Sequence, residues 1–168
     1  AKGEFKDIDD FVSRVDNFKV NKKVFESLIK SGSFDSFGLT RKMMLNNLDN
    51  IVEACKNAAT IKKNAAESLF GDDESMGTVK TSLVRDDSEL ELKTKLKFEL
   101  ESVGIYLSGH PLDEYREQIS KIKYTLSDKF DELPENGEML LVGKIEDLTT
   151  RISKKNGKKM GTIEMLDF

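Results

Sequence analysis

The chain has 168 residues, of which 38% are hydrophobic and 35% are charged, and its formal net charge at pH 7 is -4. A membrane-spanning helix needs an apolar run of about 18 residues or more, and the sequence contains no such run. One cysteine and one histidine cannot form an internal disulfide or a structural zinc site. We therefore expect a cytoplasmic protein that crosses no membrane and holds no metal.

Two helices are predicted near the start of the chain. Asp9 or Asp10 can cap a short first helix, and Asn21 is a typical N-cap for a second helix over Lys22–Lys30. Gly32 follows the second helix, at the place where a helix end favours a left-handed residue. The second helix has an apolar face made of Val24, Phe25, Leu28 and Ile29.

A single long third helix is predicted to begin after Thr40, which can cap it. Its apolar residues follow the spacing of one helix face. They are Met44, Leu48, Ile51, Val52, Cys55 and Ala59. Because Cys55 lies on this face, we interpret it as a core residue.

The helical pattern is lost between Gly71 and Asp87, where small and acidic residues predominate. We interpret this stretch as a flexible linker. Ser88 and Glu91 can then form a capping box for a further helix that Gly104 would end. The apolar stripe of that helix would be Leu92, Leu96, Leu100 and Val103.

Another helix is predicted to start at Pro111, a residue type that suits the first helical position. It would carry Leu112, Tyr115, Ile119 and Ile122. After the turn at Asn136–Gly137 the pattern becomes that of strands, with a first β-like run that starts at Met139–Val142 and a second over Met160–Phe168. Asn156–Gly157 between these two runs predicts a β-hairpin.

Two strands alone do not make a stable domain, so we expect the hairpin to be the first part of a larger β domain. The fold class is therefore mainly α, with a helix-hairpin-helix type helical region, followed by a partial β region. The chain is expected to be a multi-segment α+β fragment.

No catalytic residue is predicted. The carboxylates at Asp7, Asp9 and Asp10 are better explained as a helix start than as a metal site. Ser108 and His110 lack the third orienting group and the oxyanion site that a hydrolase needs. We interpret His110 as a loop histidine.

A helix, a glycine-containing turn and a second helix can direct backbone N–H groups and lysines at a phosphate. The candidate DNA-binding residues are Lys22, Lys23, Lys30, Ser31, Gly32, Ser33, Arg41 and Lys42. The alternative is a plain helical hairpin with ordinary surface lysines.

The C-terminal hairpin offers a second candidate nucleic-acid surface. Residues 141–168 contain six basic and four acidic side chains, a charge of +2, so the rest of the chain carries -6. This asymmetry favours an anionic partner that contacts only part of the chain. The candidate residues are Lys144, Arg151, Lys154, Lys155, Lys158 and Lys159.

A short docking peptide is predicted where the third helix meets the linker. Leu69 and Phe70 are adjacent large apolar residues with no obvious local core, and such anchors on a tether are typical of docking peptides. The alternative is that they fold back on the preceding helix.

Two segments of the sequence resemble signature regions of a known family. They are Asn21–Asp35, NKKVFESLIKSGSFD, and Leu100–Leu112, LESVGIYLSGHPL. Both are similar to segments of the alpha subunit of bacterial DNA polymerase III, and the resemblance covers nearly the whole chain in the same order.

This resemblance implies a role for each segment. Residues 21–59 match the second half of a tandem helix-hairpin-helix module that grips duplex DNA. Residues Ala66, Glu67, Ser68, Leu69 and Phe70 stand where the family has its sliding-clamp motif, although Ala66 replaces the usual Gln. An OB-fold domain would begin near Met139 and bind nucleic acid. The polymerase palm, with its catalytic aspartates and Mg²⁺, is not part of this sequence.

The resemblance divides the chain into four segments. Residues 1–65 would be helical DNA-binding module, 66–89 clamp motif and acidic flexible linker, 90–135 helical connector, and 136–168 the start of the OB-fold. We expect a non-catalytic part of a replicative polymerase, without a cofactor of its own. Its partners would be the sliding clamp, primer-template DNA, single-stranded template and other polymerase subunits. The alternative is an architectural linker that binds neither DNA nor clamp.

Overall fold

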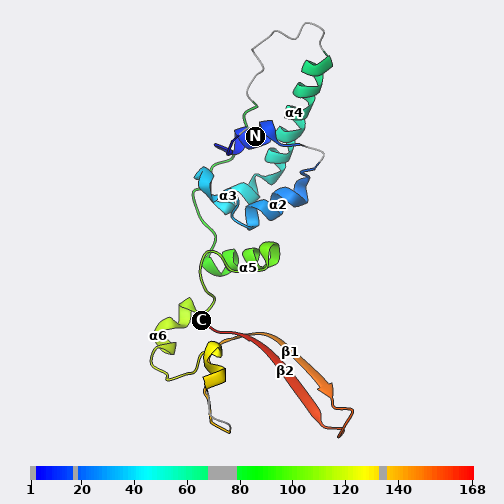
Figure 1. Ribbon diagram of the computed structural model, residues 1–168. Helices are drawn as coiled ribbons and strands as arrows, with labels where there is room; N and C mark the ends of the chain where they lie inside the picture. Colours follow the sequence, from blue (N-terminus) through cyan, green and yellow to red (C-terminus); the bar gives the residue numbers. More distant parts are fainter. Residues whose placement is uncertain (1–2, 17–18, 68–78, 133–135) are drawn as a thin grey trace. The chain divides into compact units, whose positions relative to one another are not determined.

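The computed structural model describes residues 3–16, 19–67, 79–132 and 136–168. The chain forms two compact units, Ala1–Leu107 and Ser108–Phe168 (Figure 1). The first unit is helical and the second ends in a two-stranded antiparallel sheet. This confirms the predicted order of a mainly α region followed by a β region. The boundary between the units falls inside the segment 90–135 that we interpreted as a connector.

The first unit contains five α-helices and one 3₁₀ turn within the described residues. They are α1 (Ile8–Arg14), α2 (Lys22–Lys30), η1 (Asp35–Phe37), α3 (Arg41–Asn46), α4 (Leu48–Glu67) and α5 (Leu92–Val103). Helix α4 packs against α1 and α2, and α5 packs against α2.

Side-chain caps set where the first helices begin. Asn21 Oδ1 accepts the Val24 N–H at 3.1 Å, which confirms the predicted cap and bounds of α2. Thr40 Oγ1 likewise accepts the N–H of Met43 at 3.1 Å. The cap of α1 is Asp7 rather than Asp9 or Asp10, because the helix begins two or three residues earlier, at Ile8.

The long helix predicted after Thr40 is in fact two helices, which meet at Asn47. The Met43 carbonyl accepts both the Asn47 side-chain amide, at 2.8 Å, and the Asn47 backbone N–H, at 3.1 Å. Asn47 is 2% exposed and has non-helical backbone angles. Downstream, α4 buries Ala58, whereas the predicted core residue Ala59 is only half-buried.

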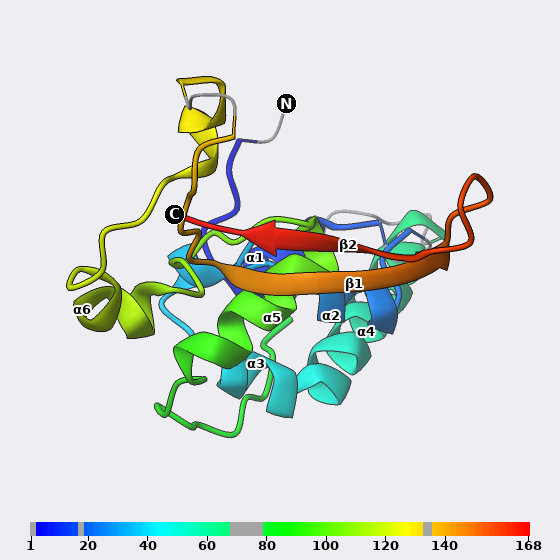
Figure 2. The same ribbon diagram turned by 90° about the horizontal axis from the view of Figure 1, so that it is seen from below.

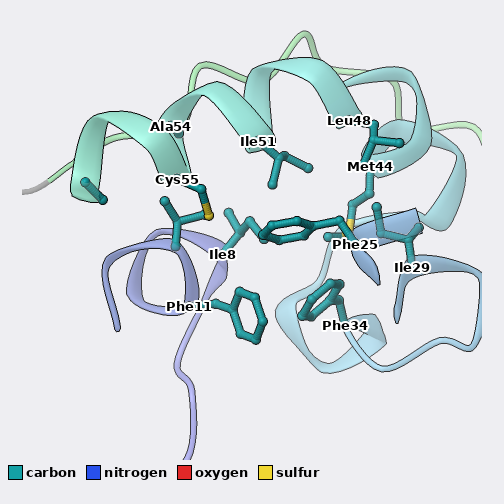
Figure 3. Close-up of a cluster of buried hydrophobic side chains, with 12 residues drawn as sticks. Ile8, Phe11, Phe25, Ile29, Phe34, Met44, Leu48, Ile51, Ala54 and Cys55 are labelled. Carbon is teal, nitrogen blue, oxygen red and sulfur yellow. The ribbon is translucent and has the colours of Figure 1, made fainter. Parts of the chain in front are cut away.

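The core of the first unit forms where α1, α2 and α4 meet. Figure 3 shows Phe25 at the centre of this cluster, with Ile51 on one side and Phe11 and Phe34 on the other. The Phe11 ring meets Phe25 and Phe34 edge to face, at centroid distances of 5.7 and 4.9 Å. Cys55 belongs to this core as predicted, and burial raises the pKa of its thiol from 9.0 to about 11.

Not all predicted apolar positions are buried. In α2, Phe25 and Ile29 are buried while Val24 is 37% exposed. In α5, Leu96 and Glu99 are buried, and the other members of the predicted stripe, Leu92, Leu100 and Val103, are exposed. Helix α5 therefore packs with a face that includes a carboxylate, a possibility that apolar spacing alone does not reveal.

Residues 79–88, called the strap below, form neither helix nor strand and run along the first unit. Val84 pairs with the Asn47 amide through both of its backbone groups, at 2.7 and 2.8 Å. Further bonds join the Thr81 N–H to Asp9 at 2.8 Å and the Ser82 carbonyl to Asn50 at 3.0 Å. The prediction of a flexible linker is therefore wrong for residues 79–87, and the rest of it, 71–78, lies outside the described residues.

The capping box predicted for α5 does not form. Ser88 bonds instead to Asp86 through its N–H and its hydroxyl, and Glu91 is the N-cap without a side-chain bond. These hydrogen bonds lower the pKa of the Asp86 carboxyl. Gly104 ends α5 with φ +84°, as predicted.

The second unit begins with short helical turns rather than the single helix predicted from Pro111. They are η2 (Asp113–Tyr115), α6 (Arg116–Ile119) and η3 (Ser127–Glu132). Leu112 and Ile119 are buried, whereas Tyr115 and Ile122 are exposed.

The sheet consists of β1 (Lys144–Ile152) and β2 (Lys159–Leu166), which lie side by side (Figure 2). The turn at Asn156–Gly157 is confirmed, with Gly157 at φ +66°. Residues 139–142, predicted as β-like, are not part of either strand. A bulge between Ile145 and Asp147 shifts the register, and the apolar residues consequently share one exposed face. These residues are Ile145, Leu148, Ile152, Ile163 and Met165.

We predict that Asn47→Ala loosens the strap and lowers the free energy of unfolding by about 2 kcal/mol, because the peptide groups of Val84 lose their partners. Hydrogen exchange of the Val84 amide and urea denaturation measure the two effects. Asn46→Ala is the matched control, because the side chain of Asn46 is exposed and lies 3.5 Å from Asp86 Oδ2. Equal effects of the two substitutions would show that Asn47 does not hold the strap in place.

Candidate nucleic-acid interface

The turn after α2 is a Schellman motif centred on Gly32 at φ +79°. The N–H of Gly32 donates to the Ile29 carbonyl at 3.0 Å, and the N–H of Ser33 donates to the Leu28 carbonyl at 3.1 Å. The end of α2 needs these donors for its last carbonyls. The expectation that these N–H groups point at a phosphate is therefore wrong.

Hydroxyl groups remain at the turn. Ser31 Oγ and Ser33 Oγ lie 2.7 Å apart, and Ser31 Oγ also donates to the Leu28 carbonyl at 2.9 Å. Ser33 is exposed and Ser31 is half-buried. The turn can thus contribute side-chain hydroxyls to a ligand, but its backbone is committed to closing α2.

Arg41 is buried beneath this turn with 3% of its surface exposed. Its guanidinium bonds to Asp35 at 2.7 and 3.0 Å and to Glu99 at 2.8 Å. The bonds to Asp35, followed by those to Glu99, raise the pKa of Arg41 against the opposing effect of burial. The predicted phosphate contact does not fit this burial, and Arg41 has a structural role instead.

The predicted lysines lie on α2 and α3, and most have acidic partners. Lys22 pairs with Asp49, and Lys30 pairs with Glu26 at 2.8 Å while lying 4.9 Å from the Phe98 ring centroid. Bonding to Lys30 lowers the pKa of Glu26. The ammonium group of Lys42 reaches Ser88 Oγ at 2.7 Å.

Lys23 is exposed beside Lys22, in the first turn of α2. Lys22 and Lys30 occupy opposite ends of this helix, about 12 Å apart at the usual helical rise. The structure therefore brings the lysines onto one helix–turn–helix segment, but it spreads them along α2 rather than clustering them at Gly32.

The predicted clamp motif is only partly within the described residues. Ala66 and Glu67 form the end of α4. Ser68, Leu69 and Phe70 lie outside the described residues, so docking by this motif stays a prediction.

The predicted nucleic-acid-binding residues of the second unit lie at the tip of the β-hairpin, except for Lys144 at the far end of β1, which pairs with Glu146 at 2.8 Å. All of them are exposed. Those at the tip are Arg151, Lys154, Lys155, Lys158 and Lys159.

His110 is held in a turn, as predicted, in which its carbonyl accepts the Asp113 N–H at 3.0 Å. Its Nδ1 accepts the Leu112 N–H at 3.2 Å, and its own N–H donates to Asp113 at 2.8 Å. Arg116 lowers the pKa of Asp113 and also lies 4.5 Å from the Phe168 ring centroid. The His110 ring contacts the same Phe168 ring at 5.0 Å.

The described residues contain neither a cluster of metal ligands nor a membrane-spanning helix. No group of three or more His, Cys, Asp or Glu side chains is placed to hold a metal ion there. Within the same ranges, no helix has the length and apolar character that crossing a membrane requires.

The residues that sequence reasoning missed are Asp35, Asn47 and Glu99. Glu99 lies three residues after Leu96, on the predicted apolar stripe. A charged residue at such a position was the available signal for a buried ion pair. The partners of these residues were not predictable, because Glu99 and Arg41 are 58 positions apart.

The chain is similar to one family model and to several curated proteins. A family model described as a helix-hairpin-helix motif matches residues 1–44, which include α1 as well as the segment from Asn21 that we expected. The chain is 48% identical over 166 residues to DNA polymerase III subunit alpha of Campylobacter jejuni. It is 43% identical over 173 residues to that of Helicobacter pylori strain J99 and 34% identical over 164 residues to that of Aquifex aeolicus.

These alignments take in nearly the whole chain but a small part of each relative. They cover 99%, 99% and 98% of this chain and 14%, 14% and 12% of the respective relatives. The chain thus spans about one seventh of the length of the curated relatives that it matches.

We predict that Gly32→Ala destabilises the fold by about 3 kcal/mol, through left-handed strain plus crowding of Arg41. An added Cβ would lie 2.2 Å from Arg41 Nη2. Gly38→Ala is the matched control, because Gly38 has φ +71° and nothing within 4 Å of an added Cβ. The control should cost only about 1 kcal/mol. Urea denaturation compares them, and equal losses would show that Arg41 does not crowd the turn.

Proposed function

We propose that this chain, which belongs to the family of bacterial DNA polymerase III alpha subunits, is a non-catalytic segment that helps to hold a replicative polymerase on DNA. The observation that carries the proposal is the alignment with alpha subunits over 99% of the chain, together with a helix-hairpin-helix match at residues 1–44. The whole protein would be a DNA-directed DNA polymerase of the cytoplasm. Its Mg²⁺-dependent chemistry would lie in a domain that this sequence does not contain.

In the first unit, side chains would neutralise duplex phosphates. Lys22, Lys23, Lys30 and Lys42 would supply positive charge, and the hydroxyls of Ser31 and Ser33 would supply hydrogen bonds. Because the turn's N–H groups close α2, binding here would depend on lysines more than on backbone donors. Such contacts position a protein on DNA without reading its sequence.

We predict that Lys22→Gln with Lys23→Gln weakens binding to a short labelled duplex. The slope of log affinity against log salt should also become shallower by about 2, since two phosphate contacts are lost. Fluorescence anisotropy at several salt concentrations measures both quantities.

The matched control for this experiment is Lys56→Gln with Lys62→Gln, which removes the same charge from exposed positions on α4. This pair should leave the salt slope unchanged. If both pairs lower affinity equally, binding reflects net charge and the proposed contact surface is wrong.

The second unit would meet single-stranded template. A positively charged groove that follows the backbone is the usual feature of OB-fold surfaces. The basic tip of the hairpin supports this proposal, with β1 and β2 as the first strands of such a domain.

The sliding clamp would bind the segment that ends in Leu69 and Phe70, and other replicative subunits would complete the assembly. A weak peptide is sufficient for this role, because tethering raises the effective concentration of a polymerase at the clamp.

We predict that a labelled peptide of residues 60–75 binds a bacterial sliding clamp with a dissociation constant of about 1 µM, a strength equivalent to about -8 kcal/mol. Leu69→Ala with Phe70→Ala should abolish binding, because the apolar anchors are removed. Anisotropy titration of both peptides is the measurement. Identical binding by both would remove the docking role, and binding by neither would indicate that Ala66 makes the motif inactive.

A second candidate function is purely architectural. Ion pairs between Lys22 and Asp49 and between Lys30 and Glu26 favour it, because paired lysines contribute less to an anionic ligand. In that case the duplex affinity of the Lys22 and Lys23 variant would equal that of the unmodified chain.

A further inference from the structure

We propose that Glu99 of α5 is a positioning residue for the Ser31–Gly32–Ser33 turn, acting through the Arg41 guanidinium. Its consequence for DNA binding rests on the proposed function, whereas the positioning itself does not. Helix α5 would accordingly belong to the helix-hairpin-helix module rather than to a connector.

Glu99 is fully buried, with 0% of its surface exposed, and both carboxylate oxygens are engaged. Oε1 accepts from Arg41 Nη1 at 2.8 Å, and Oε2 accepts the Leu107 N–H at 2.7 Å. A buried carboxylate without such partners would be strongly unfavourable. The position of α5 is therefore tied to the position of Arg41.

The guanidinium of Arg41 joins three parts of the chain at the turn. It bonds to Asp35 in η1, to Glu99 in α5, and to the Lys30 carbonyl at the end of α2 at 3.3 Å. The Lys30 carbonyl precedes the turn and Asp35 follows it, so Arg41 contacts the chain on both sides of the turn.

The turn lies directly on the guanidinium. A Cβ at Gly32 would be 2.2 Å from Arg41 Nη2 and 2.8 Å from Arg41 Cζ. With so little space between them, a shift of Arg41 requires a shift of the Gly32 backbone.

Glu99 contributes more than Asp35 to holding the Arg41 guanidinium against the turn. The Asp35 side chain is 51% exposed, so water competes for its interaction with Arg41. Water cannot replace Glu99, whose side chain is completely enclosed. Removing the charge of Glu99 leaves the buried guanidinium with the solvated Asp35 as its carboxylate partner, beside the Lys30 carbonyl, and the guanidinium must move toward Asp35 and solvent.

The test is native-state hydrogen exchange on the whole chain, comparing Glu99→Gln with Glu101→Gln. Glu101 is an exposed residue of the same helix, so its substitution is a matched control. We expect exchange of the Gly32 and Ser33 amides to accelerate about tenfold in Glu99→Gln, as local opening becomes easier. The Ile51 amide, which bonds to Asn47 in the core, should keep its rate.

Unchanged exchange at Gly32 and Ser33 in Glu99→Gln would overturn the proposal. If that variant does not fold, the double variant Arg41→Met with Glu99→Leu decides, because replacing a buried ion pair by apolar residues is often neutral for stability. Fast turn amides beside a protected Ile51 amide would then support the proposal. Turn amides as slow as in the unmodified chain would refute it.

Duplex binding separates this inference from the function on which it builds. Glu99→Gln should weaken binding several-fold with an unchanged salt slope, because every lysine remains. If exchange of the turn amides becomes faster in Glu99→Gln and neither the unmodified chain nor the variant binds duplex, Glu99 positions the turn and the proposed DNA contact is wrong. If duplex binds and the amides do not change, the DNA contact stands and the positioning role is wrong.

Discussion

The first unit depends on one buried cation. A guanidinium cannot be left without counter-charges in a protein interior, so Arg41 requires Asp35 and Glu99 at 2.7 and 2.8 Å. Meeting that requirement fixes the exit of the turn, the docking of α5 and the absence of a side chain at Gly32. Apolar burial around Phe25 supplies the driving force for collapse. The ion pairs determine which turn conformation accompanies that collapse.

Asn47 imposes a second constraint of the same kind. Its buried amide needs a donor and an acceptor, and both come from the backbone of Val84, 37 residues away. The strap is therefore recognised through its peptide groups. This explains how a segment rich in polar and charged residues is held on the first unit, with Val79 and Leu83 as its only contributions to the margin of the described core.

Several local signals in the sequence predicted the structure correctly, although the capping box of Ser88 and Glu91 did not form. The caps at Asn21 and Thr40 and the turn at Asn156–Gly157 were correct, because signal and partner lie within a few residues of each other. The break at Asn47 was missed; Asn47 also bonds to the backbone of Val84, and a partner 37 residues away was not predictable from the sequence. In the candidate site, the sequence correctly indicated which lysines lie on the helix–turn–helix segment. It did not indicate that Arg41 is buried, because this burial depends on the tertiary contact with Glu99.

The distribution of charge limits what any one surface of this chain can contribute. On our proposal, the lysines of α2 and α3 hold duplex phosphates, yet Lys22, Lys30 and Lys42 already face Asp49, Glu26 and Asp86. A lysine that binds a phosphate must then give up its carboxylate partner, so the net gain in binding free energy per contact is small. Strong retention on DNA therefore requires several weak contacts on one chain, acting together through effective concentration. A basic hairpin tip in a separate unit and an apolar motif after α4 suit that requirement better than a single high-affinity site would.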